Sequence, residues 1–353
     1  MIAKPLLNRI FSTERSLTLL GVALGLLAIV GLEGCARMLP RPASSDLERL
    51  HRYSEVYGWE PRPGARVEAG DRLTTINSLG FRGREVAPRP EVMRVMLVGD
   101  SIAFGIGVAD HETFASRLDG QGLEVVNLAV EGYGPEQSLL RLEREGLALA
   151  PDVVVMNLCL DNDFADAGLP RFLYDGVHRK PLFRLESGRL VEQDAHLRLT
   201  AAQRFGLGLR ESSRLVELLG AAVSRGHGAS EHWLDRKQRA LRDRDRAIDL
   251  VAALLARMRD VAEAVGAEFL VVVHPDELGF RRRSRWVNSL RRSPWLAGVS
   301  LVDMRERYRA RGLRFSDVAL DAVGHLSARG HREAAEVLRQ ELLRRDAGTQ
   351  GHL

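Results

Sequence analysis

Residues 92–105 read VMRVMLVGDSIAFG, an apolar run that stops at the polar turn Gly99-Asp100-Ser101. A short, mostly apolar run closed by a glycine turn is typical of a strand that is buried on both faces of a sheet. Four comparable runs follow, at 125–130 (VVNLAV), 152–160 (DVVVMNLCL), 269–273 (FLVVV) and 299–302 (VSLV). Helical segments are expected at about 135–149, 230–265 and 327–344. This alternation predicts an α/β fold with a five-stranded, doubly wound parallel sheet.

Polar residues follow each of these apolar runs directly. Ser101 follows the first, Glu131-Gly132-Tyr133-Gly134 the second and Asp161-Asn162-Asp163 the third, while Asp321 and His325 precede the last helix. In doubly wound sheets, ligands bind outside the carboxyl ends of the strands. A hydroxyl, a glycine turn, an amide and an Asp/His pair are therefore expected at one edge. Acyl transfer needs this set of a nucleophile, oxyanion donors, a base and an orienting acid.

These blocks resemble those of the SGNH or GDSL hydrolases. The resemblance covers roughly residues 92–345 in the family's order: Gly99-Asp100-Ser101-Ile102, Asn127 through Gly132, Asn162-Asp163, and His325 through His331. It extends upstream to Asn77-Ser-Leu-Gly-Phe-Arg82, which is similar to a segment found before the GDS strand in exported bacterial members. The resemblance implies the SGNH hydrolase fold, a flavodoxin-like sheet, and activity as a serine esterase.

The resemblance also implies a role for each matching residue. Ser101 would be the nucleophile, and its backbone N–H would join Gly132 and the Asn162 amide in the oxyanion hole. His325 would take the serine proton and return it to the leaving alcohol. Asp321 would orient His325, as the third catalytic residue.

The chain departs from the family pattern at two places. Leu160 stands where the family has glycine, and the carboxylate of Asp161 comes directly before Asn162, where it would repel an oxyanion unless it points away. Asp321 lies four residues before His325 rather than three. Asp317 or a backbone carbonyl is an alternative partner for His325.

Several other residues are expected to be structural. His274 follows the fourth strand and is the rival base, but it lacks the setting of His325. His331 is expected to pack or cap, Ser327 to cap the final helix, and Cys159 to be a small core residue.

The N-terminus predicts a membrane segment. Ser16–Leu32 is seventeen residues without a charge, near the lower end for a bilayer-crossing helix. Because Lys4, Arg9 and Arg15 precede it, we expect residues 1–15 to be a cytoplasmic arm and residues 16–34 a signal anchor. The chain would then be a single-pass protein of the cytoplasmic (inner) membrane, with its catalytic domain on the periplasmic or extracytoplasmic side.

Two other outcomes stay open at this terminus. Leu32-Glu33-Gly34-Cys35 resembles a bacterial lipobox, in which Cys35 is lipidated after cleavage, although Glu33 is unusual there. Ordinary signal cleavage is the second alternative. In each case the catalytic body is exported.

The remaining organisation is read from composition and periodicity. Residues 35–90 are expected to be an irregular lead-in, because their stretch from 40 to 90 is rich in Pro, Arg and Gly. Residues 91–347 would form the hydrolase domain, with an insertion at about 164–230. The segment 230–265, with Arg and Asp alternating on one side, predicts one long crossover helix.

The amino-acid composition limits the kinds of partner and cofactor that are expected. The net charge is +4, and the sequence has no block of basic residues interleaved with aromatic residues. No nucleic-acid partner is therefore expected. The positive charge is nearly all arginine, since only Lys4, Lys180 and Lys237 are lysines. The chain has neither HExxH nor CxxC and two distant cysteines, so no metal, cofactor or disulfide is expected. The oligomeric state stays open.

Three functions are compatible with these residues. The first is an esterase that removes acyl groups from an envelope or exported glycan or lipid, through an acyl-enzyme on Ser101. The second is an O-acyltransferase that uses the same residues to modify a polysaccharide. The third is a catalytically silent envelope binding protein.

Overall fold

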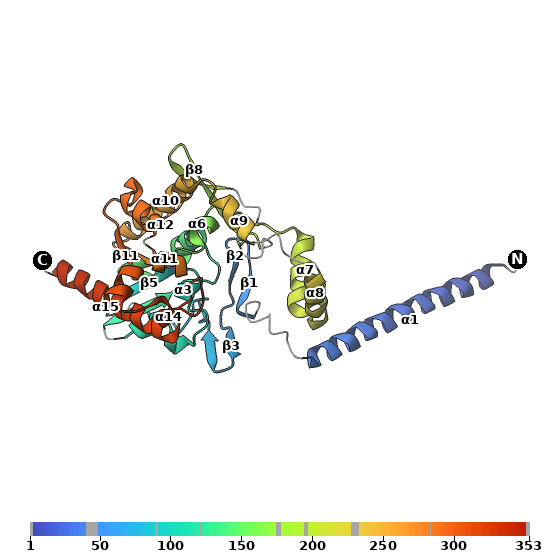
Figure 1. Cartoon of the computed structure of the whole chain (residues 1–353). Coiled ribbons are helices and arrows are strands. Elements are labelled where there is room, and N and C mark those ends of the chain that lie inside the picture. The colour runs from blue at the N-terminus through green and yellow to red at the C-terminus, as the bar shows by residue number, and fades with distance from the viewer. Residues whose placement is uncertain are drawn as a thin grey trace. The chain divides into compact units, whose positions relative to one another are not determined.

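The computed structural model describes residues 3–39, 49–88, 91–120, 122–173, 178–193, 197–226, 233–282 and 284–350. The chain divides into two compact units (Figure 1). The helical unit comprises Met1–Ser45 and Leu199–Ser230, and the sheet unit comprises Asp46–Arg198 and Glu231–Leu353.

The sheet unit is built on five parallel strands in the order β11-β10-β7-β5-β6. Their bounds are β5 Met93–Gly99, β6 Leu123–Asn127, β7 Val153–Cys159, β10 Glu268–His274 and β11 Ser300–Asp303. Counted along the chain, this order is 2-1-3-4-5, in which the direction of winding reverses between β5 and β7. The predicted doubly wound, flavodoxin-like sheet is therefore confirmed.

Helices cover both faces of this sheet, which explains why its strands are apolar throughout. On one face, α5 (Pro135–Arg141) and α10 (Arg244–Glu263) pack against Met96, Met156 and Val271. On the other, α4 (Phe114–Leu118), α13 (Met304–Ala310) and α15 (Ala328–Gln350) pack against Leu97, Val155 and Val272. One hydrophobic core thus lies on each face of the sheet. The loops that follow the strands emerge at the edge formed by the strands' carboxyl ends.

The lead-in contains more regular structure than its composition predicts. It forms the antiparallel hairpins β1–β2 (His51–Ser54, Gly58–Pro61) and β3–β4 (Arg66–Ala69, Arg72–Thr75). The insertion carries a third hairpin, β8–β9 (Leu182–Glu186, Arg189–Gln193). Each strand has only four or five residues, too few for a clear alternation of apolar and polar positions.

The prediction of a single long helix at about 230–265 is wrong. The structure has two helices there, α9 (Trp233–Ala240) and α10, separated by a turn at residues 241–243. Asp243 ends that turn, and its side chain accepts a hydrogen bond from Arg246 N at 3.1 Å. An aspartate that caps the second helix from a non-helical conformation breaks a pattern that otherwise reads as continuous.

The remaining helices are short and connect the larger elements. They are α3 Ser101–Phe104, α6 Asp163–Asp166, α11 Glu277–Arg281, α12 Arg285–Arg292 and α14 Phe315–Val318, with single helical turns at Asp110–Glu112, Leu142–Gly146, Leu147–Leu149 and Pro294–Leu296. The predicted limits of the lead-in and the insertion at residues 90 and 230 lie outside the described residues.

The helical unit contains α1 (Ala3–Met38), α7 (Ala201–Ser212) and α8 (Arg214–Gly226). Within α1, the segment Leu17–Met38 has a mean hydropathy of 2.1 and is long and apolar enough to cross a membrane. A signal sequence near the N-terminus can have the same length and composition. Glu33 accepts hydrogen bonds from Arg214 N at 2.9 Å and Leu215 N at 3.0 Å. The residue that is unusual for a lipobox therefore binds the first amides of α8.

Candidate active site

The turn between β5 and α3 presents Ser101 at the start of a helix. Gly99 has φ +148°, and a Cβ there would lie 2.7 Å from the Asn157 carbonyl oxygen, so the turn requires glycine. The Asp100 side chain accepts a hydrogen bond from Ile102 N at 3.0 Å and caps α3. Ser101 is the first residue of that helix and follows the carboxyl end of β5, which lies between β6 and β7 in the sheet.

Ser101, His325 and Asp321 form one chain of hydrogen bonds. The Ser101 Oγ lies 2.8 Å from His325 Nε2, and His325 Nδ1 lies 2.6 Å from Asp321 Oδ2. With Asp321 accepting at Nδ1, Nε2 is left to accept the serine proton. Although partial burial opposes it, the hydrogen bond from His325 lowers the pKa of Asp321, so this acid is ionised at neutral pH.

The loop absorbs the extra residue between Asp321 and His325 by folding around the carboxylate. The Asp321 Oδ1 accepts from Gly324 N at 3.0 Å and His325 N at 3.2 Å, while Oδ2 faces the imidazole. Gly324 has φ +104°, and a Cβ there would lie 2.7 Å from the Pro275 carbonyl oxygen. The alternative acid, Asp317, instead accepts hydrogen bonds from Arg314.

Gly132 occupies a turn that follows β6, the edge strand next to β5. It has φ +77°, and an added Cβ would lie 2.7 Å from the Phe172 ring. The Trp59 Nε1 donates to the Glu131 carbonyl oxygen at 2.9 Å, and the Trp59 ring lies 5.4 Å from that of Phe172. The lead-in and the insertion thus both pack on this glycine turn.

Asn162 occupies the turn after β7, the strand on the other side of β5. Its Nδ2 donates one hydrogen bond to Asp166 Oδ2 at 3.1 Å. An amide group carries two N–H donors, and this bond uses one of them. The neighbouring Asp163 Oδ2 accepts from Cys159 N at 2.7 Å, which closes the turn onto the strand.

The carboxylate of Asp161 is paired. Its Oδ1 lies 2.8 Å from Lys237 Nζ of α9, and both side chains are largely buried. The expected repulsion between Asp161 and an oxyanion is therefore offset by a neighbouring cation.

Arg82 from the lead-in holds the loop that follows Ser101. Its Nη1 donates to the Phe104 and Gly105 carbonyl oxygens at 2.8 and 2.6 Å. Its Nη2 donates to the Val108 carbonyl oxygen at 2.8 Å, and its Nε pairs with Asp110 at 2.9 Å. The segment Asn77–Arg82 thus supports the loop that follows Ser101. Its resemblance to a segment of exported family members was the only sequence signal for this role.

Two acids next to Ser101 and Gly132 hold protons more tightly than usual. Burial raises the pKa of Asp100 to about 6. Burial also raises the pKa of Glu131 to about 7, against the opposing effect of His325 and Arg82. Displaced pKa values concentrate at functional sites, and these two acids flank Ser101 and Gly132.

Three of the residues that were expected to be structural, His274, His331 and Cys159, lie in the core. His274 is fully buried and stacks on Phe114 at 6.3 Å between ring centroids. His331 is also buried, and its Nδ1 accepts from Phe114 N at 3.1 Å. Burial lowers the pKa of both histidines to about 3. Cys159 is buried in β7, and Ser327 Oγ accepts from Gly330 N at 3.1 Å at the start of α15.

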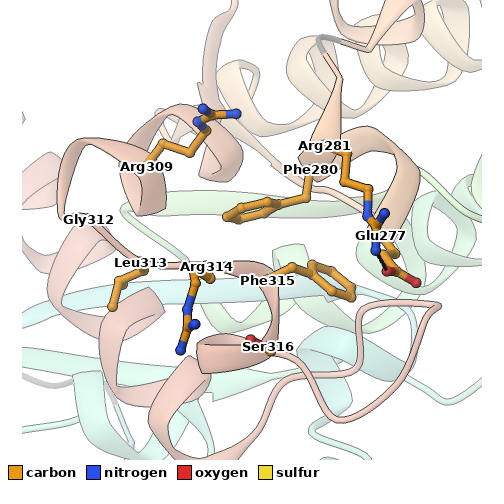
Figure 2. Close-up of a pocket in the computed structure, with 9 residues that line it drawn as sticks. All are labelled: Glu277, Phe280, Arg281, Arg309, Gly312, Leu313, Arg314, Phe315 and Ser316. Atoms are coloured by element: carbon orange, nitrogen blue, oxygen red, sulfur yellow. Dashed lines mark hydrogen bonds and ion pairs between the residues drawn. The ribbon is translucent and has the colours of Figure 1, made fainter.

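A cleft of about 540 Å³ opens between α11, the end of α13 and the start of α14 (Figure 2). It is lined by Glu277, Phe280, Arg281, Arg309, Gly312, Leu313, Arg314, Phe315 and Ser316. The Glu277 N donates to the Ala322 carbonyl oxygen at 3.1 Å, which joins the cleft wall to the loop between Asp321 and His325. Phe280 and Phe315 lie against each other in the cleft, and Arg281 turns toward Glu277.

Among the residues that the structure describes, no group of three or more His, Cys, Asp or Glu side chains could hold a metal ion. The polar groups brought together at this edge are a serine hydroxyl, an imidazole, a carboxylate and an amide.

No family model matches the chain, and no curated protein matches it by sequence. Its fold is similar to solved structures of low identity. An acetyl-xylooligosaccharide esterase from Geobacillus is 13% identical with a TM-score of 0.41, over 72% of this chain and 96% of that one. A lipolytic protein of the G-D-S-L family from Veillonella parvula is 13% identical with a TM-score of 0.39, over 69% and 95%.

A two-domain esterase active on acetylated mannans is 11% identical with a TM-score of 0.38. The match covers 71% of this chain and spans about half, 49%, of that esterase. The assignment of the fold rests on the chain's own strand order, 2-1-3-4-5.

Proposed function

We propose that the chain is a serine esterase of the SGNH type that removes ester-linked acyl groups from a glycan or lipid of the cell envelope. The observation that carries this proposal is the hydrogen-bonded series Ser101 Oγ, His325 Nε2 and Nδ1, Asp321 Oδ2 at the carboxyl edge of the sheet. It is the arrangement that activates a serine hydroxyl for attack on an acyl carbon.

The first half of the reaction forms an acyl-enzyme. As the Ser101 Oγ bonds to the ester carbonyl carbon, His325 Nε2 takes the hydroxyl proton. The carbonyl oxygen becomes an oxyanion, which the N–H groups of Ser101 and Gly132 and the second Asn162 N–H would stabilise. The bond to the alcohol oxygen then breaks, and His325 returns its proton to that oxygen.

The second half releases the acid. His325 takes a proton from water as the water oxygen bonds to the acyl carbon, and the same donors bind the second oxyanion. Collapse breaks the bond to Ser101 Oγ, which recovers its proton from His325. Asp321 keeps the imidazole oriented and stabilises its charged form during both halves.

Solvent access favours hydrolysis over transfer to a second alcohol. The side chain of His325 is 21% exposed and that of Asp321 is 45% exposed, so water can reach the base. A polysaccharide O-acyltransferase would use the same residues. An acyl donor supplied with candidate glycans separates the two functions, since hydrolysis yields free acid and transfer yields an acylated glycan.

The N-terminal helix supports a membrane-anchored enzyme. We place the sheet unit outside the cytoplasmic membrane, because the basic residues precede the apolar segment. Intact-mass measurement of the mature protein tests this assignment. An uncleaved chain retains Met1 or Ile2, a lipoprotein begins at a modified Cys35, and a cleaved signal leaves another N-terminus.

The esterase activity is tested with short p-nitrophenyl esters and a fluorophosphonate probe. The wild type is expected to turn over the esters and to be labelled at Ser101, and Ser101→Ala is expected to lose both. Ester turnover that survives in Ser101→Ala rejects the proposed nucleophile. A wild type that neither hydrolyses esters nor reacts with the probe indicates the silent binding protein instead.

A further inference from the structure

The two lysines of the sheet unit both contact carboxylates that flank Asn162. The chain has three lysines in all, and its other cations are arginines. Lys237 pairs with Asp161, one residue before Asn162, and Lys180 pairs with Asp166, four residues after it. Lysine is a compact point charge, whereas arginine is a wide planar fork. The rare lysines therefore stand where a small cation is needed.

Lys180 is fully buried and joins two turns that are far apart in the sequence. Its Nζ contacts Glu136 Oε1, donates to the Asp166 carbonyl oxygen at 2.7 Å and lies 3.6 Å from Asp166 Oδ1. The side chains of all three residues have no exposed surface. Burial alone would lower the pKa of Lys180, but the two carboxylates outweigh it and raise the pKa. The lysine is therefore charged in the folded protein.

Glu136 connects Lys180 to the turn that carries Gly132. It is the second residue of α5, directly after Gly132-Tyr133-Gly134-Pro135. Its carboxylate lies against Gly134, where an added Cβ would be only 2.5 Å from Glu136 Oε2. A displacement of Glu136 would therefore be transmitted to the backbone that presents the Gly132 N–H.

Asp166 connects Lys180 to the turn that carries Asn162. Its Oδ2 accepts from Asn162 Nδ2, while its other oxygen and its carbonyl face Lys180. The direction of the Asn162 amide is thus fixed by a carboxylate that Lys180 holds in place. Because two buried acids share this one lysine, its loss would leave like charges facing each other without a cation.

We propose that Lys180, a residue of the insertion, is a positioning residue that sets the spacing of the two oxyanion donors Gly132 and Asn162 through Glu136 and Asp166. This inference rests on the proposed esterase function. It gives the insertion a catalytic purpose, because the same segment also places Phe172 on Gly132. Oxyanion donors act on the transition state, so misplacing them lowers kcat more than it changes KM.

Lys180→Met tests this proposal in the full chain, since methionine fills a similar space without charge. We expect kcat for p-nitrophenyl acetate to fall about 10- to 100-fold, with KM changed by less than about threefold. The inhibition constant of a boronic acid, which forms a tetrahedral adduct on serine, is expected to rise by a similar factor. Leu338→Ala, a core change in α15, is the control for lost stability alone, and its kcat below its melting temperature is expected to match the wild type.

The double variant Lys180→Met/Glu136→Gln separates positioning from folding. It returns the net charge of the cluster to its original value, so the melting temperature is expected to recover, while the connection between the two turns stays broken. A low kcat and weak boronic acid binding at a recovered melting temperature support the proposal. Recovery of kcat together with the melting temperature overturns it, as does an unchanged kcat in Lys180→Met. A wild type without Ser101-dependent turnover rejects the esterase function itself, and the inference with it.

Discussion

Asp321 Oδ2 lies 2.6 Å from His325 Nδ1 although the two residues are four apart in the sequence. The same carboxylate accepts two backbone N–H groups of its own loop, so its position does not depend on the imidazole alone. An acid fixed in this way can orient the base even though nearly half of its side chain is exposed.

Asp321→Asn tests this orienting role. An amide in place of the carboxylate no longer stabilises the charged imidazole and can favour the wrong tautomer, so we expect kcat to fall about 10²- to 10⁴-fold. Steady-state hydrolysis of p-nitrophenyl acetate gives the measurement. Asp317→Asn is the matched control and is expected to stay within about twofold of the wild type. A larger fall in kcat for Asp317→Asn than for Asp321→Asn would show that Asp317, and not Asp321, is the acid that orients His325.

Asn162→Ala removes a side-chain donor that we place in the oxyanion hole. We expect kcat to fall about 10²- to 10³-fold with little change in KM, because the donor acts on the transition state. Asn288→Ala in α12 changes an exposed amide and should leave both constants unaltered. A rise in KM at constant kcat would make Asn162 a substrate-binding residue instead.

Lys237→Met leaves the Asp161 carboxylate without its lysine beside the Asn162 turn. The unbalanced negative charge opposes an oxyanion, so we expect kcat to fall about 3- to 10-fold. Adding Asp161→Asn removes that charge and is expected to restore the rate in the double variant. A double variant as slow as Lys237→Met would show that the lysine acts through structure rather than charge.

Glu131 makes stability depend on pH. Burial raises its pKa from 4.5 to about 7, so between these values the folded state keeps a proton that the unfolded chain has released. Stability contributed by this proton is complete below pH 4.5 and is lost as the pH rises toward about 7.

Glu131→Gln removes this dependence. We expect the variant and the wild type to have equal melting temperatures near pH 4 and the variant to be more stable above pH 7, by about 1–3 kcal/mol. Thermal unfolding across this range gives the difference, and Asp71→Asn at the exposed β3–β4 turn is the control. A difference that does not grow with pH contradicts the raised pKa.

The sheet could be predicted from the sequence because both of its faces are covered, which makes its strands short and apolar from end to end. The turns at Ser101 and Asn162 could be placed for the same reason, since each follows such a run directly. The hairpins of the lead-in could not be predicted, because strands such as His51–Ser54 are too short to show a period. The break before α10 was missed because a capping aspartate at 243 looks like one more member of the Arg/Asp alternation.

The pairing of Asp321 with His325 depends on the path of a loop, which residue spacing alone does not give. The cluster around Lys180 depends on contacts among three segments separated by many residues. Its one sequence signal was the lysine itself, in a chain whose other cations are almost all arginine.

The bonds between Glu33 and the start of α8 affect how the protein can be shortened for expression. Any form that begins after residue 33, whether made by a signal peptidase or by design, loses the acceptor for the Arg214 and Leu215 amides. Ser213 already supplies one acceptor, to Val216 N, and a longer acidic side chain at that position is the nearest local substitute. Ser213→Asp is therefore the first change to make in a version of this chain without its N-terminal helix.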